Sequence, residues 1–320
     1  MSQQQGGPVV AGVDGSESAL DAVRCAAAEA ADRRRGLRLV AVFTPLPSGT
    51  RHDLGLAPVY REQAMGVLRE QLAAAAEVAT AAAPGIEVET ELRTGYPAQV
   101  LVEESHGASL TVVGSRGLGG FSGLLVGSVA VAVAAHGGSP VLVVRGDGAA
   151  RGGSAAGGAG VVGGDGAAGG AGVVDGDGAS QAGLPVVLGV DGSPAGEAAV
   201  GLAFETAARR AVPLRAVHAW SDVVLDPAVA VLIDREAMET EERALLAERL
   251  AGWSQKYPDV EVEHVLVRDR PAHALVEESA RAGLVVVGSR GRGGLAGLLL
   301  GSVGHALLHH ARSPVLIARP

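Results

Sequence analysis

An internal repeat limits the folds open to this chain more than any other feature. The segment VVAGVDGS at 9–16 returns as VVLGVDGS at 186–193, and PAQVLVEES at 97–105 returns as PAHALVEES at 271–279. Because 320 residues are about twice the length of a typical domain, the repeat predicts two domains of one fold. We place them at residues 1–145 and 184–320.

The segment between the repeats, residues 146–183, has a very different composition. It consists almost entirely of Gly, Ala and Asp, and it repeats a short Gly-Gly-Ala-Gly-Val-Val pattern. A Gly-rich segment of this kind behaves as a flexible coil. The sequence therefore predicts a disordered linker over 146–183.

Each repeat alternates short apolar runs with segments of helical length. In the first repeat the runs, bounded by turn residues, are 8–14, 37–43, 87–92, 110–114 and 141–144. This rhythm predicts strand–helix–strand units with right-handed crossovers. The expected fold class is α/β, with a doubly wound, five-stranded parallel sheet in each domain. A composition of 48% hydrophobic but only 2% aromatic residues suits buried Val-rich strands and Ala-rich helices.

Several residues predict where helices begin. Ser16 and Ser193 follow the first strand of each repeat and are suited to cap a helix N-terminus. Pro97 and Pro271 are suited to the first turn of a later helix, where the missing N–H costs nothing.

A Gly-rich segment follows the fourth predicted strand of each repeat. Gly114-Ser115-Arg116-Gly117 is followed by nine residues and then Gly127-Ser128, and 288–302 repeat this spacing. In this fold class ligands bind beyond the carboxyl ends of the strands, where Gly lets backbone N–H groups approach an anion. A helix starting near Gly127 would add its positive dipole end. The segment therefore predicts a phosphate site, although tight turns without a ligand also fit the pattern.

These residues resemble the ATP-binding branch of the universal stress protein family. The pattern in that branch is Gly, two residues, Gly, nine residues, and Gly followed by Ser or Thr, and both repeats match it. The resemblance extends over both halves but not the linker. It implies a Rossmann-like, adenine nucleotide alpha-hydrolase-like fold. It also implies that the two halves pair through their last strands as a pseudo-dimer, with a homodimer of chains as a further expectation.

The resemblance also implies which residues bind ATP with Mg²⁺. Adenine and ribose would lie at the ends of the first two strands, and the phosphates in the Gly-rich segment. In the first half the residues are Val13, Asp14, Val42, Val113, Gly114, Arg116, Gly117, Gly127, Ser128 and Val129. In the second half they are Val190, Asp191, Ala219, Val287, Gly288, Arg290, Gly291, Gly301, Ser302 and Val303.

The two sites are expected to differ in strength. Ala219 replaces Val42 and offers less surface to adenine, and Asp269 stands where the first half has Gly95. A carboxylate near the phosphates would repel them. We therefore expect the second site to be the weaker one.

Other chemistry finds little support in the sequence. Lys256 is the only lysine, so no Walker A segment exists. Residues 291–296 match Gly-x-Gly-x-x-Gly/Ala, but they follow the wrong strand for a dinucleotide fold and lack the later acidic residue. No Gly-x-Ser-x-Gly elbow is present. No catalytic residue or protein-held metal is predicted, and the chain is expected to be no enzyme, with at most slow ATP hydrolysis.

Three smaller features have simple structural interpretations. Cys25 is predicted to be a small buried apolar residue in an Ala-rich helix. His305 and His309 could hold a metal by spacing, but they are better explained as partners of a helix C-terminus. The Glu-Glu pairs at 103–104 and 277–278 are predicted to form solvated helix faces.

The resulting hypothesis is a cytoplasmic, ATP-binding universal stress protein that responds to nucleotide and acts on an unknown protein partner. The single cysteine and the lack of an apolar leader or membrane-length segment favour the cytoplasm. The net charge of -9 disfavours nucleic acid and anionic membranes. The alternative is a protein–protein adaptor with empty pockets, and an ATP-using enzyme is a third reading that no residue set demands.

Overall fold

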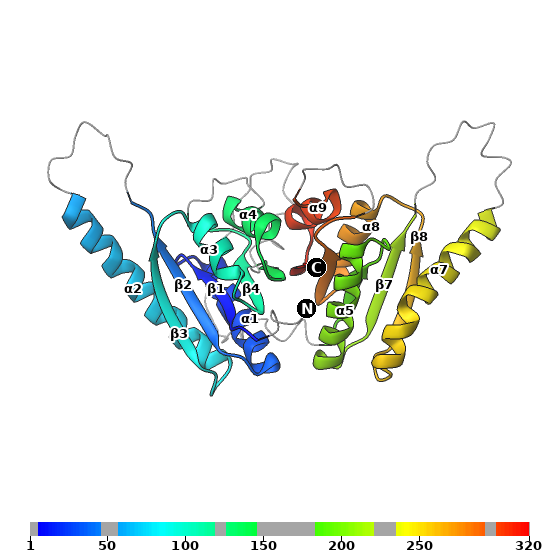
Figure 1. The fold of residues 1–320 in the computed structure, drawn as a ribbon, viewed down its shortest axis with the longest axis horizontal. Helices are drawn as coiled ribbons and strands as arrows, with labels where there is room; N and C mark the ends of the chain where they lie inside the picture. The colour runs from blue at the N-terminus through cyan, green and yellow to red at the C-terminus, as the bar shows by residue number, and fades with distance from the viewer. Residues whose placement is uncertain are drawn as a thin grey trace, which may run out of the picture.

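A computed structural model describes residues 6–45, 57–118, 126–145, 183–220, 235–291 and 299–319. Both halves have the predicted α/β architecture, and together they form a two-domain molecule (Figure 1). Most of the predicted linker, residues 146–182, lies outside the described residues, as does most of the Gly-x-Gly-x-x-Gly/Ala match, residues 292–296.

The elements of the first half alternate strictly between strand and helix. They are β1 (Val9–Val13), α1 (Glu17–Arg33), β2 (Leu37–Phe43), α2 (Ala57–Ala82), β3 (Val88–Thr94), α3 (Pro97–Ser105), β4 (Leu110–Gly114), α4 (Ser128–His136) and β5 (Val141–Val144).

The second half repeats this order. Its elements are β6 (Val186–Gly189), α5 (Pro194–Arg210), β7 (Leu214–Ala219), α7 (Arg235–Lys256), β8 (Val262–Val267), α8 (Pro271–Glu278), the 3₁₀ helix η3 (Ser279–Arg281), β9 (Leu284–Gly288), α9 (Ser302–His310) and β10 (Val315–Ala318).

The predicted helix starts are confirmed. The Ser16 hydroxyl accepts a hydrogen bond from the Ala19 N–H at 3.1 Å, and Ser193 accepts one from Gly196 at 3.0 Å. These bonds satisfy N–H groups that the first helical turn leaves unpaired. Pro97 and Pro271 open α3 and α8.

The ten strands form one continuous sheet in the order β3-β2-β1-β4-β5-β10-β9-β6-β7-β8. Strands within each half are parallel, whereas β5 and β10 pair antiparallel, with Val143 opposite Val315. The last strands therefore join the two halves at the middle of the sheet (Figure 1). Because this pair is antiparallel, the carboxyl ends of the strands in the two halves point to opposite edges of the sheet.

Helices cover both faces of the sheet and bury a core on each. Successive strand residues alternate between the cores, so that Val9 and Ala11 belong to one and Val10 to the other. The first core includes residues of α1, α2, α5 and α7, and the second includes residues of α3, α4, α8 and α9. Val, Leu and Ala form most of both cores, as the composition predicts.

An ionic cluster also joins α1 of the first half to α5 of the second. The Glu29 carboxylate is only 5% exposed and lies 2.7 Å from Arg210 and 3.4 Å from Arg209. Arg33, one turn further along α1, binds the same carboxylate at 3.0 Å. Three guanidinium groups therefore share one buried carboxylate at the boundary between the halves.

The prediction of solvated Glu-Glu faces is wrong for one residue of each pair. Glu103 is exposed, but Glu104 is 8% exposed and accepts hydrogen bonds from Arg93 at 2.6 Å and Arg38 at 3.3 Å. In the second half Glu278 pairs with Arg215 at 3.1 Å. The arginines come from strands, so the helix spacing alone could not identify these pairs.

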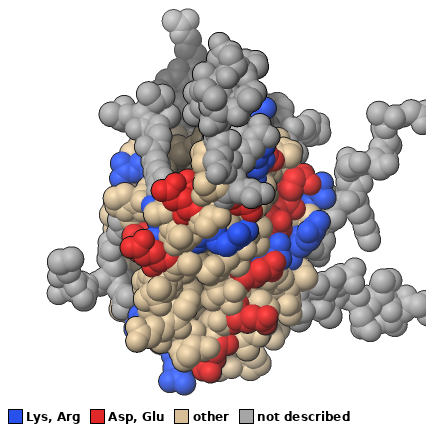
Figure 2. Space-filling view, turned by 90° about the vertical axis from the view of Figure 1, so that its right-hand side faces the viewer, with Lys and Arg blue, Asp and Glu red and all other residues tan. Residues whose placement is uncertain are grey.

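The end of the molecule that carries α7 and β8 is charged with both signs. Figure 2 shows acidic and basic side chains interspersed over this face. Among the described helices, none combines the length and the apolar character needed to cross a membrane.

Candidate functional site

A cavity of about 760 Å³ opens at the carboxyl ends of β1, β2 and β4 in the first half. All ten residues that the sequence assigned to the first site line it. The sequence did not assign the wall on the α2 side, where Phe43 and Tyr60 lie with ring centroids 6.3 Å apart and Gln71 also faces the cavity. This wall was missed because its α2 residues are far from any motif.

Asp14 ties the turn after β1 to the Gly-rich segment. One carboxylate oxygen accepts hydrogen bonds from the Ser16 N–H at 3.0 Å and hydroxyl at 2.6 Å, and the other accepts the Leu118 N–H at 3.0 Å. A Cβ at Gly117 would lie 2.5 Å from the second oxygen. Glycine at 117 is therefore needed for this close approach, and Asp14 shapes the cavity as well as lining it.

The glycines before α4 and α9 are not required by the fold. Gly127 has φ -79° and ψ 150°, and Gly301 has φ -71° and ψ 162°, which any residue can adopt. A Cβ at Gly127 would meet nothing closer than 3.6 Å, and one at Gly301 nothing closer than 3.5 Å. By contrast, a Cβ at Gly114 would lie 2.6 Å from the Ser18 backbone oxygen. Among the described residues, a Cβ at 127 or 301 would thus make only ordinary van der Waals contact with the loop, so the described backbone does not require glycine there.

The N-termini of α4 and α9 face these cavities without a side-chain cap. Gly127 and Gly301 occupy the cap positions, and neither has a side chain to accept the N–H groups of the first turn. Ser128 and Ser302, the first residues of the two helices, line the cavities. Uncapped N–H groups and the positive end of the helix dipole suit an anion.

The corresponding cavity of the second half is smaller, about 330 Å³, and all ten residues assigned to the second site line it. His218 lies on β7 between Val217 and Ala219, which line the cavity, and it connects this strand to α7. Its ring nitrogens lie 2.7 Å from the Val190 carbonyl oxygen and 2.9 Å from a carboxylate oxygen of Glu242. Strand register matches His218 to Ala41, and the helices match Glu242 to Ala64. Two alanines of the first half are thus replaced by a polar pair.

Asp269, predicted from the sequence to lie near the second site, is engaged by neighbouring groups. It accepts hydrogen bonds from the Arg270 N–H and from His273, and these lower the pKa of its carboxyl, the bond with His273 most. It is not among the described residues that line the cavity. The described difference from the first half that lies beside this cavity is the pair formed by His218 and Glu242.

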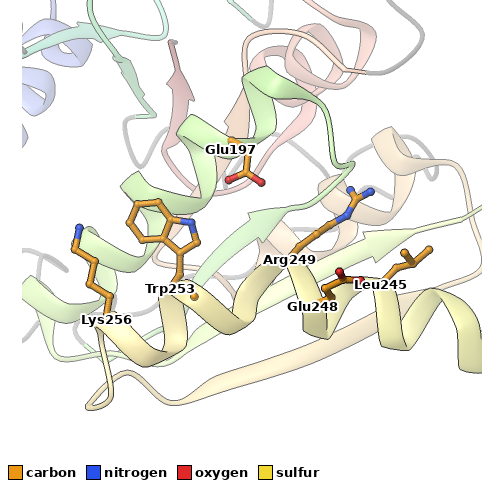
Figure 3. Close-up of a pocket in the computed structure, with 7 residues that line it drawn as sticks. Glu197, Leu245, Glu248, Arg249, Trp253 and Lys256 are labelled. Atoms are coloured by element: carbon orange, nitrogen blue, oxygen red, sulfur yellow. The ribbon is translucent and has the colours of Figure 1, made fainter. Parts of the chain in front are cut away.

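A separate groove of about 630 Å³ runs between α5 and α7 in the second half (Figure 3). Arg249 lies in it against Gly192, which has φ +70°; a Cβ at that glycine would overlap the guanidinium. In the first half Gln71 packs against Gly15 in the same way but lines the large cavity. The replacement of Gln71 by Arg249 is thus a second difference between the halves.

Aromatic packing closes the floor of this groove. Trp253 stacks with Tyr257 and Phe204, with centroids 6.3 Å apart in both pairs. Lys256 places its ammonium 4.9 Å from the Trp253 ring centroid. A Cβ at Gly201 would lie 2.6 Å from the Trp253 ring, so glycine there makes room for the indole.

Cys25 and the histidines of α9 are the reactive side chains that the sequence singled out. Cys25 is partly buried, and burial together with the charge of Glu29 raises the pKa of its thiol to about 12. His305 and His309 have ring centroids 4.6 Å apart. Within the described residues, however, no three His, Cys, Asp or Glu side chains are grouped to hold a metal ion.

Comparisons with known proteins by family, by sequence and by structure all find universal stress proteins. Residues 7–145 and 184–319 match the family described as the universal stress protein family. Universal stress protein Rv2005c of Mycobacterium tuberculosis is 40% identical over 319 residues, covering 97% of this chain and 96% of the relative. The crystal structure of a universal stress protein from Archaeoglobus fulgidus superposes with a TM-score of 0.62 at 19% identity, over 99% of both chains. A universal stress protein solved in complex with cAMP is 33% identical over 43% of this chain and 96% of its own, with a TM-score of 0.32.

Proposed function

The chain belongs to the universal stress protein family, and we propose that it is an ATP-binding member whose nucleotide-bound state controls its association with a protein partner. The observation that carries this proposal is that glycine stands at 127 and 301 although the described part of the fold would accept a Cβ at either position. The fold tolerates a side chain at both positions, whereas a phosphate approaching the backbone would not. A ligand at these loops accounts for glycine there.

The first cavity offers suitable surfaces for each part of the nucleotide. Adenine and ribose would lie near Val13, Asp14 and Val42, which line the cavity at the carboxyl ends of β1 and β2. The phosphates would lie against Gly127 and the uncapped N-terminus of α4. Mg²⁺ would enter together with the phosphates. In nucleotide sites, phosphate oxygens and water molecules commonly supply most of the ligands of this ion.

The two sites are proposed to be unequal. The first cavity holds about 760 Å³ and the second about 330 Å³. Because His218 and Glu242 fill space next to the second cavity, ATP should bind first and more tightly in the first half.

The test is calorimetric titration of ATP with Mg²⁺ into the wild-type protein, Gly127→Ala and Gly301→Ala. Both substitutions fit the backbone, so they should fold as the wild type does. Gly127→Ala is expected to weaken the tighter site at least tenfold, about 1.4 kcal/mol, and Gly301→Ala to leave that site unchanged. If the wild-type protein gives no heat of binding at millimolar ATP, or if all three proteins bind ATP equally, the proposal is overturned.

The second half supports a different role from the first. Its narrowed cavity favours an adaptor surface that works without nucleotide. The test is to purify the protein without added ligand, denature it and count the adenine nucleotides released per chain. One nucleotide per chain would indicate that one site is filled. Two per chain would contradict an empty second half. The domain boundaries at 145 and 184 and a cytoplasmic location remain parts of the proposal.

A further inference from the structure

The antiparallel pairing of β5 with β10 produces a crossed contact between the halves. Arg145 directly follows β5, and its guanidinium donates a hydrogen bond to the Leu308 carbonyl oxygen near the C-terminus of α9. Arg319 directly follows β10 and donates in the same way to the Ala134 carbonyl oxygen near the C-terminus of α4. Each half therefore places an arginine against a helix end of the other.

Arg145 carries its charge close to the phosphate loop of the first half. Burial lowers the pKa of Arg145, and the charge of Arg116 lowers it further. Arg116 lines the first cavity and is exposed. No carboxylate within the described part of the chain forms an ion pair with either arginine. Gly114 pairs with Val144 and the Ser115 N–H donates to the Val144 carbonyl oxygen at 2.8 Å, so Arg116 and Arg145 follow neighbouring strand ends. Among the described residues, the partly buried Arg145 has no carboxylate partner.

Helix α9 adds a histidine cluster at this crossing. His309 follows Leu308 directly, and its ring centroid lies 4.6 Å from that of His305 and 6.1 Å from that of His310. Burial, His305, His310 and Arg145 all lower the pKa of His309, in that order. Every charged group that acts on His309 is therefore a base.

The other crossing lacks this cluster. Arg319 lies near Arg290 of its own loop, as Arg145 lies near Arg116. The residues of α4 that correspond to His305 and His309 are Val131 and Ala135. The contact of Arg145 with α9 is therefore more basic than the otherwise similar contact of Arg319 with α4. The second contact can serve as a control for the first in experiments on the same chain.

A partly buried cluster of bases without a counter-ion is unfavourable, and an anion would neutralise it. We propose that Arg116, Arg145 and His309 form an anion subsite at the junction of the two halves, one that takes a phosphate or pyrophosphate group. The group is either a free anion or the terminal phosphates of a nucleotide in the first cavity. Only the second source rests on the proposed function.

The probe is inorganic pyrophosphate, titrated into the full chain at pH 6 and pH 8. A bound anion raises the pKa of His309, so binding takes up a proton and tightens as the pH falls. We expect one site per chain that binds about tenfold more tightly at pH 6. His309→Ala, which copies the Ala135 position, should lose this gain and keep only the pH dependence that the protonation of pyrophosphate itself causes.

Matched arginine variants locate the site. Arg145→Gln should weaken pyrophosphate binding at least tenfold, and Arg319→Gln, at the other crossing, should leave it unchanged. Equal affinities of the wild type, Arg145→Gln and His309→Ala would overturn the subsite. So would the loss of pyrophosphate binding in Gly127→Ala alone, because that result would place the anion in the phosphate loop.

Competition with ATP separates the two sources. If ATP displaces pyrophosphate from the wild-type protein, the terminal phosphates of the nucleotide use the subsite. If both bind together, the subsite takes a free anion. If ATP fails to bind at all while pyrophosphate still requires Arg145 and His309, the subsite stands and the proposed ATP function falls.

Discussion

Arg210 on α5 lies 2.7 Å from Glu29 on α1 and so links the two halves by a buried ion pair. Arg209 joins the same carboxylate at 3.4 Å. Glu29→Gln would leave these guanidinium groups without their shared counter-ion, which typically costs about 3 kcal/mol for a buried pair. We expect a loss of that size in the free energy of unfolding, measured by urea denaturation.

Glu205→Gln is the control for this prediction. Glu205 pairs with Arg209 at 2.6 Å but is 45% exposed, so its removal should cost less than about 1 kcal/mol. Equal destabilisation by the two variants would contradict the importance we assign to burial at Glu29.

The same carboxylate should make stability depend on acid. Burial raises the pKa of Glu29, but Arg210, Arg33 and Arg209 outweigh it and hold the pKa below its usual 4.5. A lowered pKa contributes stability above the unfolded value, and this contribution is lost as the pH falls through the folded value. Thermal unfolding between pH 6 and pH 3 should show a fall below about pH 4.5 that is smaller in Glu29→Gln. Parallel curves for both proteins would refute this assignment.

Cys25 should react slowly in the folded protein. With a pKa raised from 9.0 to about 12, its thiolate population at pH 8 falls about a thousandfold. Alkylation by iodoacetamide, followed by mass spectrometry, should therefore be slow in buffer and complete in denaturant. Rapid modification of the folded chain would show that the thiol is less buried than the structure indicates.

Removing the polar pair beside the second cavity should make that site more like the first. His218→Ala with Glu242→Ala restores the residues found at Ala41 and Ala64. If the first site binds ATP, we expect the double variant to gain affinity at the second site by tenfold or more, measured by calorimetry. Unchanged binding there would mean that the cavity is limited by another feature.

Much of the fold follows from the sequence because the strands are short Val-rich runs with clear ends. In the first half the residues predicted for the second, fourth and fifth strands coincide with β2, β4 and β5, and the other two strands differ by two residues or fewer at either end. The site residues were brought together as expected because they lie at strand ends, which a parallel sheet aligns along one edge.

The contacts that sequence reasoning missed all depend on residues distant along the chain. The sequence predicts a solvated Glu104, but neighbouring strands bring Arg38 and Arg93 within hydrogen-bonding distance of its carboxylate. Glu29 and Arg210 meet only when the two halves are joined. No local periodicity encodes such partners, because each side chain alone is typical of an exposed helix or strand.

The β5–β10 pair has a consequence for how the two halves could change during evolution. In a dimer of identical chains, one mutation at a two-fold contact alters both copies at once. Here each copy is encoded separately, so the helix end that Arg145 contacts carries His309, whereas the helix end at the opposite crossing carries Ala135. The fused arrangement also forms within one chain, so its two halves stay paired at any dilution and remain free to diverge.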